Sequence, residues 1–387
     1  EGESYMYTSF RVEAYRPAEF SVRVRAAAPS FLLGDSAAAF VSANYLFGAP
    51  LAGQKVAWNA YLDRDVFQPE GFEGFQFGVP EWYEDETERF SGRVLSQSRA
   101  LLDEQGGARF AAPVLAAGVD FPLSLTVSAD VTSPGRQVIG ASEKIIIHPA
   151  SYYIGLKPST SFAEAMKPLL FELTTVTPEG AAAPGKSLKV RLVKRQWHSV
   201  RKAGSGGRYE WLSKAVDTPI DSFAVTTGAA AVTKSFTPRE AGVYFLEAVG
   251  REAGGRTTRT EAYLYVTGKG YVAWEREDDD RIELVADRSG YKPGQTARVM
   301  VKSPFESARA LVTLEREGVM SQQVLTLTGS TPTIEVPLTH KHLPNVFMSV
   351  ILLRGRSSDH LYSEEGEDLG RPAFKIGYVN LPVDPGN

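Results

Sequence analysis

The chain of 387 residues contains no cysteine, which excludes a disulfide framework, a thiol nucleophile and a cysteine-based metal site. It also lacks an apolar run of 18 residues and an Asn-x-Ser/Thr acceptor for N-glycans. No leader of charged, apolar and small residues opens it, so we expect residue 1 to be a cut inside a longer protein.

A strong charge of one sign is missing as well. Lys and Arg number 42 and Asp and Glu 46, for a net charge of −4. This balance gives no overall attraction to nucleic acid or to an anionic membrane. Apolar residues make up 43% and charged residues 23%, so a chain of this length can bury the cores of two to four soluble domains.

Glycine (35) and proline (23) separate short apolar runs along the chain, a pattern that favours strands. The stretch at 286–305 shows the plan. Pro293-Gly294 predicts a type II turn, because proline fixes its own φ and glycine accepts a positive φ. Apolar residues then alternate with long polar or flexible ones over 297–302, which predicts a strand with one packed and one wet face.

The same plan recurs. Gly34 precedes predicted strands at 37–45 and 55–61, and it lies 260 positions before Gly294. A middle copy is expected halfway between them. Predicted strands at 169–176 and 188–193 fit it, although this copy has lost its turn glycine. We therefore predict an all-β fold of tandem seven-stranded, immunoglobulin- or fibronectin-like β-sandwiches.

Four segments follow from this spacing. Residues 1–16 are expected to be the terminal strand of a preceding domain plus a linker, and the sandwiches are expected at 17–149, 150–268 and 269–387. The first sandwich would carry an acidic and aromatic insertion at 63–103. Within it, 94–104 is a weak helix candidate.

Six segments together resemble the macroglobulin-domain region of bacterial α2-macroglobulins, and the resemblance covers essentially the whole chain. They are FRVEAYRPAEF (10–20), YLFGAPLAGQKV (45–56), GRYEW (207–211), DDDRIELVAD (278–287), YKPG (291–294) and PNVF (344–347). Each motif alone is weak. The six occur in the order expected for macroglobulin domains that precede the bait-region domain.

The resemblance implies a part of a large periplasmic, usually lipid-anchored protein that inhibits proteases by trapping them. In that family a bait segment is cleaved, the macroglobulin domains rearrange, and a cysteine thioester in a helical domain captures the attacker. This chain has neither the cysteine nor a helical domain, so no catalytic or capturing residue transfers. The implied partners are target proteases, met through the full-length parent, and neighbouring macroglobulin domains, with any membrane anchor outside these residues.

Proline, glycine and aromatic residues gather at 16–19, 149–153 and 267–274. We interpret these segments as junctions whose modest interfaces set the interdomain angles and permit rearrangement. Four aromatic side chains are expected to bury against adjacent domains: Tyr152, Tyr153, Tyr271 and Trp274.

Nine acidic residues fall between Asp63 and Glu88, interleaved with aromatic ones. Clustered oxygens could bind calcium and aromatic rings could stack on sugars, but packing of the insertion on its own or a neighbouring domain is the favoured interpretation. If a surface here meets a partner, we expect it at Phe72, Phe75, Trp82 and Tyr83. Such a surface would suit the alternative function, a cell-surface adhesion module, or a carbohydrate-binding accessory module.

Three further clusters have a chemical and a structural interpretation, and the structural one is favoured for each. His340, His342 and His360 with Asp359 could hold zinc but suit an exposed loop, and the basic stretch at 186–208 could bind single strands but suits the wet face of a hairpin. Asp278, Asp279 and Asp280 could act as acid and base but suit a solvated or salt-bridged junction. We expect no enzyme, metal, cofactor or nucleic-acid partner.

Overall fold

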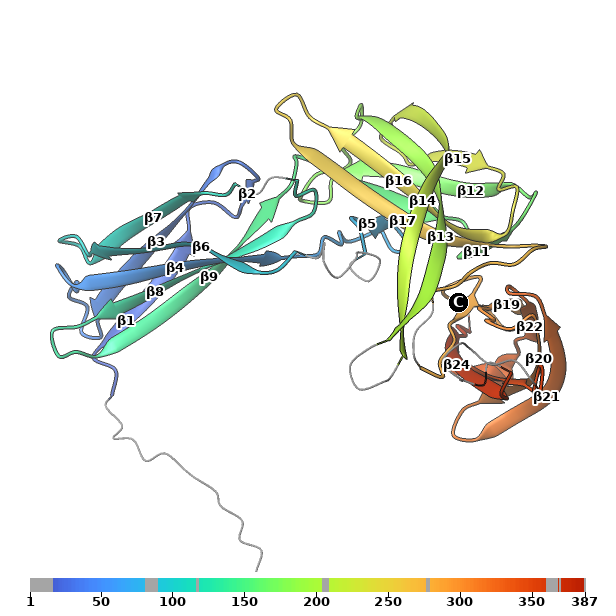
Figure 1. Cartoon of the computed structure of the whole chain (residues 1–387). Helices are drawn as coiled ribbons and strands as arrows, with labels where there is room; N and C mark the ends of the chain where they lie inside the picture. Colours follow the sequence, from blue (N-terminus) through green and yellow to red (C-terminus); the bar gives the residue numbers. More distant parts are fainter. Residues whose placement is uncertain are drawn as a thin grey trace, which may run out of the picture. The chain divides into compact units, whose positions relative to one another are not determined.

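Three β-sandwiches make up the described part of the chain, residues 17–80, 90–115, 118–203, 209–275, 279–359, 368 and 370–385 of the computed structural model (Figure 1). The all-β prediction is confirmed. The chain divides into two units, Glu1–Phe67 with Glu84–Ser151 and Gln68–Tyr83 with Tyr152–Asn387. Among the described residues, no helix is long and apolar enough to cross a bilayer. The strand expected within residues 1–16 lies outside the described residues.

The first sandwich pairs a three-stranded sheet, order β1-β3-β7, with a five-stranded sheet, order β2-β9-β8-β4-β6. Its strands are β1 (Phe20–Ala26), β2 (Ser30–Leu32), β3 (Ser36–Tyr45), β4 (Lys55–Arg64), β6 (Arg93–Leu101), β7 (Gly107–Pro113), β8 (Leu123–Thr132) and β9 (Val138–His148). The helix considered at 94–104 was wrong, because this segment forms β6 and pairs with β4. Tertiary pairing here overrides a weak helical pattern.

The second sandwich has a four-stranded sheet, order β15-β12-β10-β5, and a five-stranded sheet, order β11-β17-β16-β13-β14. Its strands are β5 (Gln76–Phe77), β10 (Tyr153–Pro158), β11 (Phe162–Glu164), β12 (Leu169–Val176), β13 (Ser187–Ala203), β14 (Tyr209–Thr226), β15 (Val232–Phe236), β16 (Gly242–Arg251) and β17 (Thr257–Thr267). The strand predicted at 169–176 is confirmed to the residue. β5 comes from the insertion.

The third sandwich packs the sheet β18-β19-β22 against the sheet β21-β20-β23-β24. Its elements are β18 (Leu284–Ala286), β19 (Thr296–Val301), β20 (Ser307–Glu315), β21 (Val319–Thr328), β22 (Thr333–Pro337), the 3₁₀ helix η3 (His340–His342), β23 (Asn345–Arg354) and β24 (Ala373–Pro382). Among described residues it has the seven strands expected. The first sandwich has eight, including the short strand β2, and the second has nine, including the short strand β11 and β5 from the insertion, so the seven-strand expectation was wrong for these two.

One turn recurs at the start of all three sandwiches. The amide of Gly34 donates to Val114 O, that of Gly294 to Leu338 O, and that of Met166 to Pro238 O, in each case beyond the next strand of the same sheet. φ is positive at all three: 91°, 90° and 67°. The middle copy therefore keeps the left-handed backbone conformation after losing its glycine. At Gly294 a hydrogen bond from Gln295 N to Lys292 O confirms the predicted turn.

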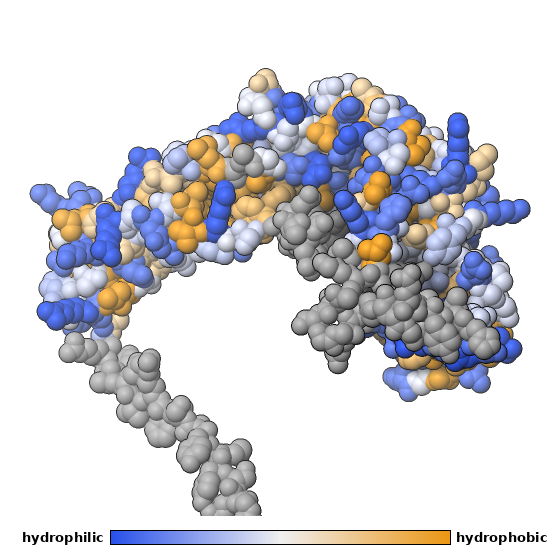
Figure 2. Space-filling view, in the orientation of Figure 1, coloured by the Kyte–Doolittle hydropathy of each residue, from blue (hydrophilic) through white to orange (hydrophobic). Residues whose placement is uncertain are grey.

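Apolar side chains that remain on the surface do not merge into one area on the face drawn in Figure 2, where separate orange patches lie among blue residues. Isolated exposed apolar residues are normal for soluble proteins. The contacts between sandwiches are therefore found from the apolar residues that are buried within a unit.

Candidate functional site at the junction of the second and third sandwiches

A buried apolar cluster joins the second and third sandwiches. Its members come from the second sandwich, the connecting segment and the third sandwich: Phe162, Ala241, Val243, Tyr265, Val272, Trp274 and Met300. All are 9% exposed or less. A buried apolar cluster of this kind holds two domains together through the hydrophobic effect. We call this junction closed, because solvent reaches little of the cluster.

Trp274 lies at the centre of this junction cluster. Its indole Nε1 donates to Ser330 O (3.0 Å), and the amide of Val272 donates to Ser330 Oγ (2.8 Å). The indole meets the Tyr265 ring edge-on, with centroids 5.9 Å apart. A tryptophan buried to 8% exposure needs a partner for its N–H, and Ser330 on the third sandwich supplies one.

Lys302, at the end of β19, is sandwiched against the same aromatic rings. Its ammonium lies 4.3 Å from the Tyr265 centroid and 5.2 Å from that of Trp274, and it forms an ion pair with Glu283. Met300 on the same face of β19 is fully buried. The wet face predicted for this strand was therefore wrong, because long stems counted as polar pack against the second sandwich.

An ion pair lies beside the apolar cluster. Arg298 Nη2 contacts Glu164 Oε1 at 2.8 Å, and the guanidinium lies 5.5 Å from the ring centroid of Phe162. Lys167 also bonds Glu164, at 2.6 Å. The hydrogen bond from Lys167, followed by that from Arg298, lowers the pKa of Glu164 despite some desolvation.

Asp287 ties the turn of the third sandwich to the second. Its Oδ1 accepts from Tyr291 Oη (2.7 Å) and from the amide of Arg298 (3.0 Å). Its backbone carbonyl accepts from Ser161 N (3.2 Å) and Thr160 Oγ1 (3.1 Å), both on the second sandwich. Burial, followed by the bond to Asp287, raises the pKa of Tyr291. Asp287 thus accepts hydrogen bonds from residues of both the second and the third sandwich.

Within the insertion, β5 extends the four-stranded sheet of the second sandwich. Phe77 stands opposite Gly155 of β10, where a Cβ on Gly155 would lie 2.9 Å from the Phe77 ring. Gly78 donates to Thr260 Oγ1 (3.0 Å) and accepts from the amide of Glu261 (3.2 Å). Glycine at position 155 therefore makes room for the aromatic ring of the added strand.

The described residues of the surface predicted to meet a partner protein pack against other residues of the second unit instead. Phe72 packs against Phe75 and Phe77 with centroids 5.9 and 6.0 Å apart, and Lys157 lies 5.2 Å from the Phe75 centroid. Phe72 and Phe75 are half-buried. Trp82 and Tyr83 lie outside the described residues.

The four expected junction aromatics lie in different places. Tyr152 (2% exposed) belongs to the core of the second sandwich, with its hydroxyl against Gly250. Tyr153 (2%) is in β10, and Trp274 is in the junction cluster. The expected burial of Tyr271 was wrong, because it is 59% exposed. Successive residues of an extended segment face opposite ways, so Val272 and Trp274 turn inward and Tyr271 outward.

Two carboxylates on the outer face of the second sandwich stand directly opposite each other in β16 and β17. The side chains of Glu247 and Glu261 are each 7% exposed. Arg191 pairs with Glu247, Arg259 lies 3.1 Å from Glu261 and 4.0 Å from Glu247, and Tyr263 Oη donates to Glu261 (3.2 Å). Burial raises the pKa of Glu261. Sequence could not find this pair, because it depends on the register between strands.

Arg195 corrects the expectation that the basic stretch lies on a wet face. Its side chain is 11% exposed and bonds Asp217 through two nitrogens, at 2.8 and 2.7 Å. The guanidinium also lies 5.2 Å from the ring centroid of Phe245. Its charge is matched by an internal partner, as is that of Arg191.

No group of three His, Cys, Asp or Glu side chains suited to a metal occurs in the part of the chain that is described. His340 and His342 belong to η3, and Nδ1 of His342 accepts from the amide of Thr339 (3.1 Å). Asp279 accepts from the amide of Arg281 (3.0 Å) and lies 3.8 Å from Lys375. His360 and Asp278 lie outside the described residues.

Three protein families match successive parts of the chain. They are "Bacterial Alpha-2-macroglobulin MG5 domain" over 20–149, "Bacterial macroglobulin domain 6" over 155–264 and "Alpha-2-macroglobulin bait region domain" over 282–387. The third sandwich thus matches the bait-region domain itself, whereas we had expected that domain to follow.

Curated relatives match over nearly the whole chain. An alpha-2-macroglobulin homolog of Nostoc is 27% identical over 97% of this chain and 20% of its own length, and an alpha-2-macroglobulin of Xylella fastidiosa is 25% identical over 98% and 22%. The chain thus spans about a fifth of the length of these relatives. The native conformation of E. coli alpha-2-macroglobulin gives a TM-score of 0.49 at 18% identity, over 97% of this chain and 24% of that one.

Proposed function

Because the chain belongs to the bacterial alpha-2-macroglobulin family, we propose that it is a scaffold segment of a broad-spectrum protease inhibitor. In the proposed parent, a target protease cleaves a bait segment, the domains change arrangement, and the attacker is trapped. These residues would contribute mechanics and no bond-making chemistry. The parent would reside in the periplasm, held to the membrane by a lipid anchor outside these residues.

The closed junction is the observation that carries the mechanical part of this proposal. Cleavage within a bait-bearing domain moves its neighbours only if the domains are coupled. Trp274, Lys302 and Asp287 couple the third sandwich to the second through apolar, cation–π and hydrogen-bonded contacts. We infer that the two sandwiches move as one body. The rearrangement that we expected at 267–274 would then occur at other junctions.

The test uses the full-length parent and trypsin. After incubation, the proposal expects trypsin that still cleaves a small chromogenic peptide but not casein, because the trapped enzyme is shielded from large substrates. A parent carrying Trp274→Ala should leave more trypsin active on casein than one carrying Tyr271→Ala, whose side chain is exposed. Trypsin that cleaves casein fully after meeting the unaltered parent would refute the trap.

The one-body inference has its own readout in hydrogen exchange. Amides of β16, β17 and 272–274 should keep their protection when the parent is cleaved, since their contacts lie inside the moving body. A marked gain in exchange at these amides, in a parent that still traps trypsin, would locate the hinge at this junction and overturn the inference.

A further inference from the structure

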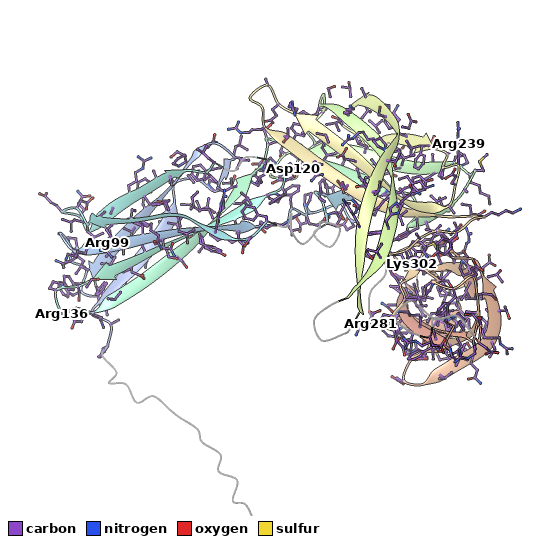
Figure 3. The ribbon with its side chains drawn as sticks, viewed as in Figure 1. Arg99, Asp120, Arg136, Arg239, Arg281 and Lys302 are labelled. Atoms are coloured by element: carbon purple, nitrogen blue, oxygen red, sulfur yellow. The ribbon has the colours of Figure 1, made fainter. Side chains whose placement is uncertain are left out.

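A cavity of about 1040 Å³ opens between β13, the connecting segment and β24, all within the second unit. Arg281 and Lys302, which both line it, lie on the side of the third sandwich that faces the β13–β14 hairpin (Figure 3). We propose that this cavity binds an extended peptide segment through that segment's carboxylate side chains. The proposal goes beyond the scaffold role and does not depend on it.

The cavity presents large aromatic side chains to solvent. Tyr271 and Tyr378 are each 59% exposed and Phe374 is 49% exposed, and all three line the cavity. Exposed aromatic rings beside arginine are the composition that marks protein recognition surfaces. A volume of this size accommodates several residues of a peptide.

The lining cations divide into those with a carboxylate partner and those without. Lys302 pairs with Glu283 and Lys375 lies near Asp279, so their charges are balanced internally. Arg354 and Arg281 make no ion pair with any described residue. These two arginines supply the charge that an incoming carboxylate would neutralise.

The side chain of Arg354 has a hydrogen-bond donor without an acceptor, and this is the main observation behind the proposal. Its Nη2 donates to Arg371 O (2.9 Å) and its guanidinium lies 5.2 Å from the Phe305 centroid. Its Nε is buried and finds no hydrogen-bond partner. A buried donor left unpaired is costly, and a guanidinium fork matches the two oxygens of a carboxylate. The residue is thus held in place with one donor unused.

A peptide fits the cavity better than a small anion because arginines and exposed aromatic rings line it together. The outer edge of β24 is already bonded to the connecting segment, since the backbone of Ile376 bonds Asp280 O and Ile282 N. Recognition would therefore use the side chains of the extended segment, with carboxylates on the arginines and apolar groups on the rings.

The test measures binding of fluorescein-labelled peptides to the 387-residue chain by fluorescence anisotropy. The probes are Gly-Glu-Tyr-Glu-Val-Glu-amide, labelled with fluorescein at its N-terminal amine, and the same labelled peptide with Gln for each Glu. We expect the Glu peptide to bind at least about tenfold more tightly, because carboxylates form charge-assisted bonds with arginine. Arg354→Gln and Arg281→Gln should each weaken it at least about fivefold, and both effects should shrink with added salt. The matched control is Arg309→Gln, an exposed residue of β20 that does not line the cavity.

Three outcomes would overturn the proposal. They are equal binding of the two peptides, full binding in both arginine variants, and displacement of the peptide by inorganic phosphate at concentrations equal to its own, which would indicate a simple anion site. Thermal unfolding of each variant checks that it is folded before its binding is compared. Arg281→Gln keeps the test valid if Arg354→Gln is unstable, because Arg281 is exposed.

Discussion

The central strands β4 of the first sandwich and β16 of the second differ in how many of their faces are buried. In β4, buried and exposed residues alternate from Lys55 to Asp63. In β16, every residue from Gly242 to Ala248 is buried. Both strands have an inward face in their own core, but Val243 on the outer face of β16 packs in the junction cluster with the third sandwich.

The difference in burial is matched by a difference in how apolar and polar residues alternate along the two strands. β4 reads KVAWNAYLDR, with period two, while β16 reads GVYFLEAVGR, with an unbroken apolar run at 243–246. A strand covered on both faces loses its alternation. The sequence of β16 therefore indicates a strand covered on both faces, and its outer face is covered by the third sandwich at Val243 and by side chains of its own sandwich at Phe245 and Glu247. The experiments below test the contacts and turns that distinguish the sandwiches.

The largest effect is expected from Trp274→Ala, which would make β16 resemble β4. Removing a buried tryptophan costs about 3–5 kcal/mol, and here it also leaves Ser330 O without its donor. Hydrogen exchange at β16 and β17 should rise while that of β4 stays constant as an internal reference.

The control for this change is Tyr271→Ala, three residues earlier and 59% exposed, for which an effect within about 0.5 kcal/mol is expected. If the two variants shift exchange at β16 equally, the junction cluster is not what covers that strand.

Much of the fold could be predicted because turns and alternation are local. The type II turn at Gly294 was found from a single stretch, and the strand at 169–176 from its alternation at the place where the repeat spacing predicts a middle copy. β6 was mistaken for a helix candidate, because RVLSQSRAL contains good helix formers and only its pairing with β4 decides.

The site was harder to predict because it depends on what meets across the sandwiches. Arg298 and Lys302 fit the pattern of a wet face, yet their stems and charges pack against Phe162 and Tyr265. Tyr271 and Trp274 look equally suited to burial in sequence, and only the path of the connecting segment separates them. The alternation of residues along a single segment predicts neither the packing of the two cations nor which of the two aromatic side chains is buried.

Tyr291→Phe should have the next largest effect, about 1–2 kcal/mol. The substitution removes the hydroxyl that donates to Asp287 and leaves a carboxylate of 9% exposure with one donor fewer. The first sandwich has no such tyrosine at its turn, where Asp35 accepts instead from Leu32 N. Urea unfolding should show the loss, with Tyr378→Phe, 59% exposed, as the neutral control. Equal stabilities of the two variants would mean that Asp287 does not need this bond.

Met166→Gly should stabilise the second sandwich by about 0.5–1 kcal/mol. Met166 holds φ at 67°, where a side chain costs roughly 1–2 kcal/mol, and the greater freedom of glycine in the unfolded chain offsets only part of this gain. Its side chain is 70% exposed, so little packing is lost. Gly34→Ala at the corresponding turn of the first sandwich should destabilise instead. Thermal unfolding of both variants checks the opposite signs, and a destabilised Met166→Gly would show that the methionine side chain has a packing role.

The smallest effect is expected from Glu164→Gln, and it should depend on pH. The pKa of Glu164 is lowered in the folded chain, chiefly by Lys167, so its ionised form stabilises the fold above the ordinary glutamate range. That contribution is lost as pH falls through the lowered pKa.

Because both partners of the Arg298 ion pair are about a third exposed, the gain near neutral pH should be only on the order of 0.5 kcal/mol and should shrink in salt. The melting temperatures of the unaltered chain and the variant should therefore differ by a constant amount above about pH 6 and converge as the pH falls below about 4. A difference that persists unchanged in acid would assign Glu164 a packing role and leave the apolar cluster as the main connection between the two sandwiches.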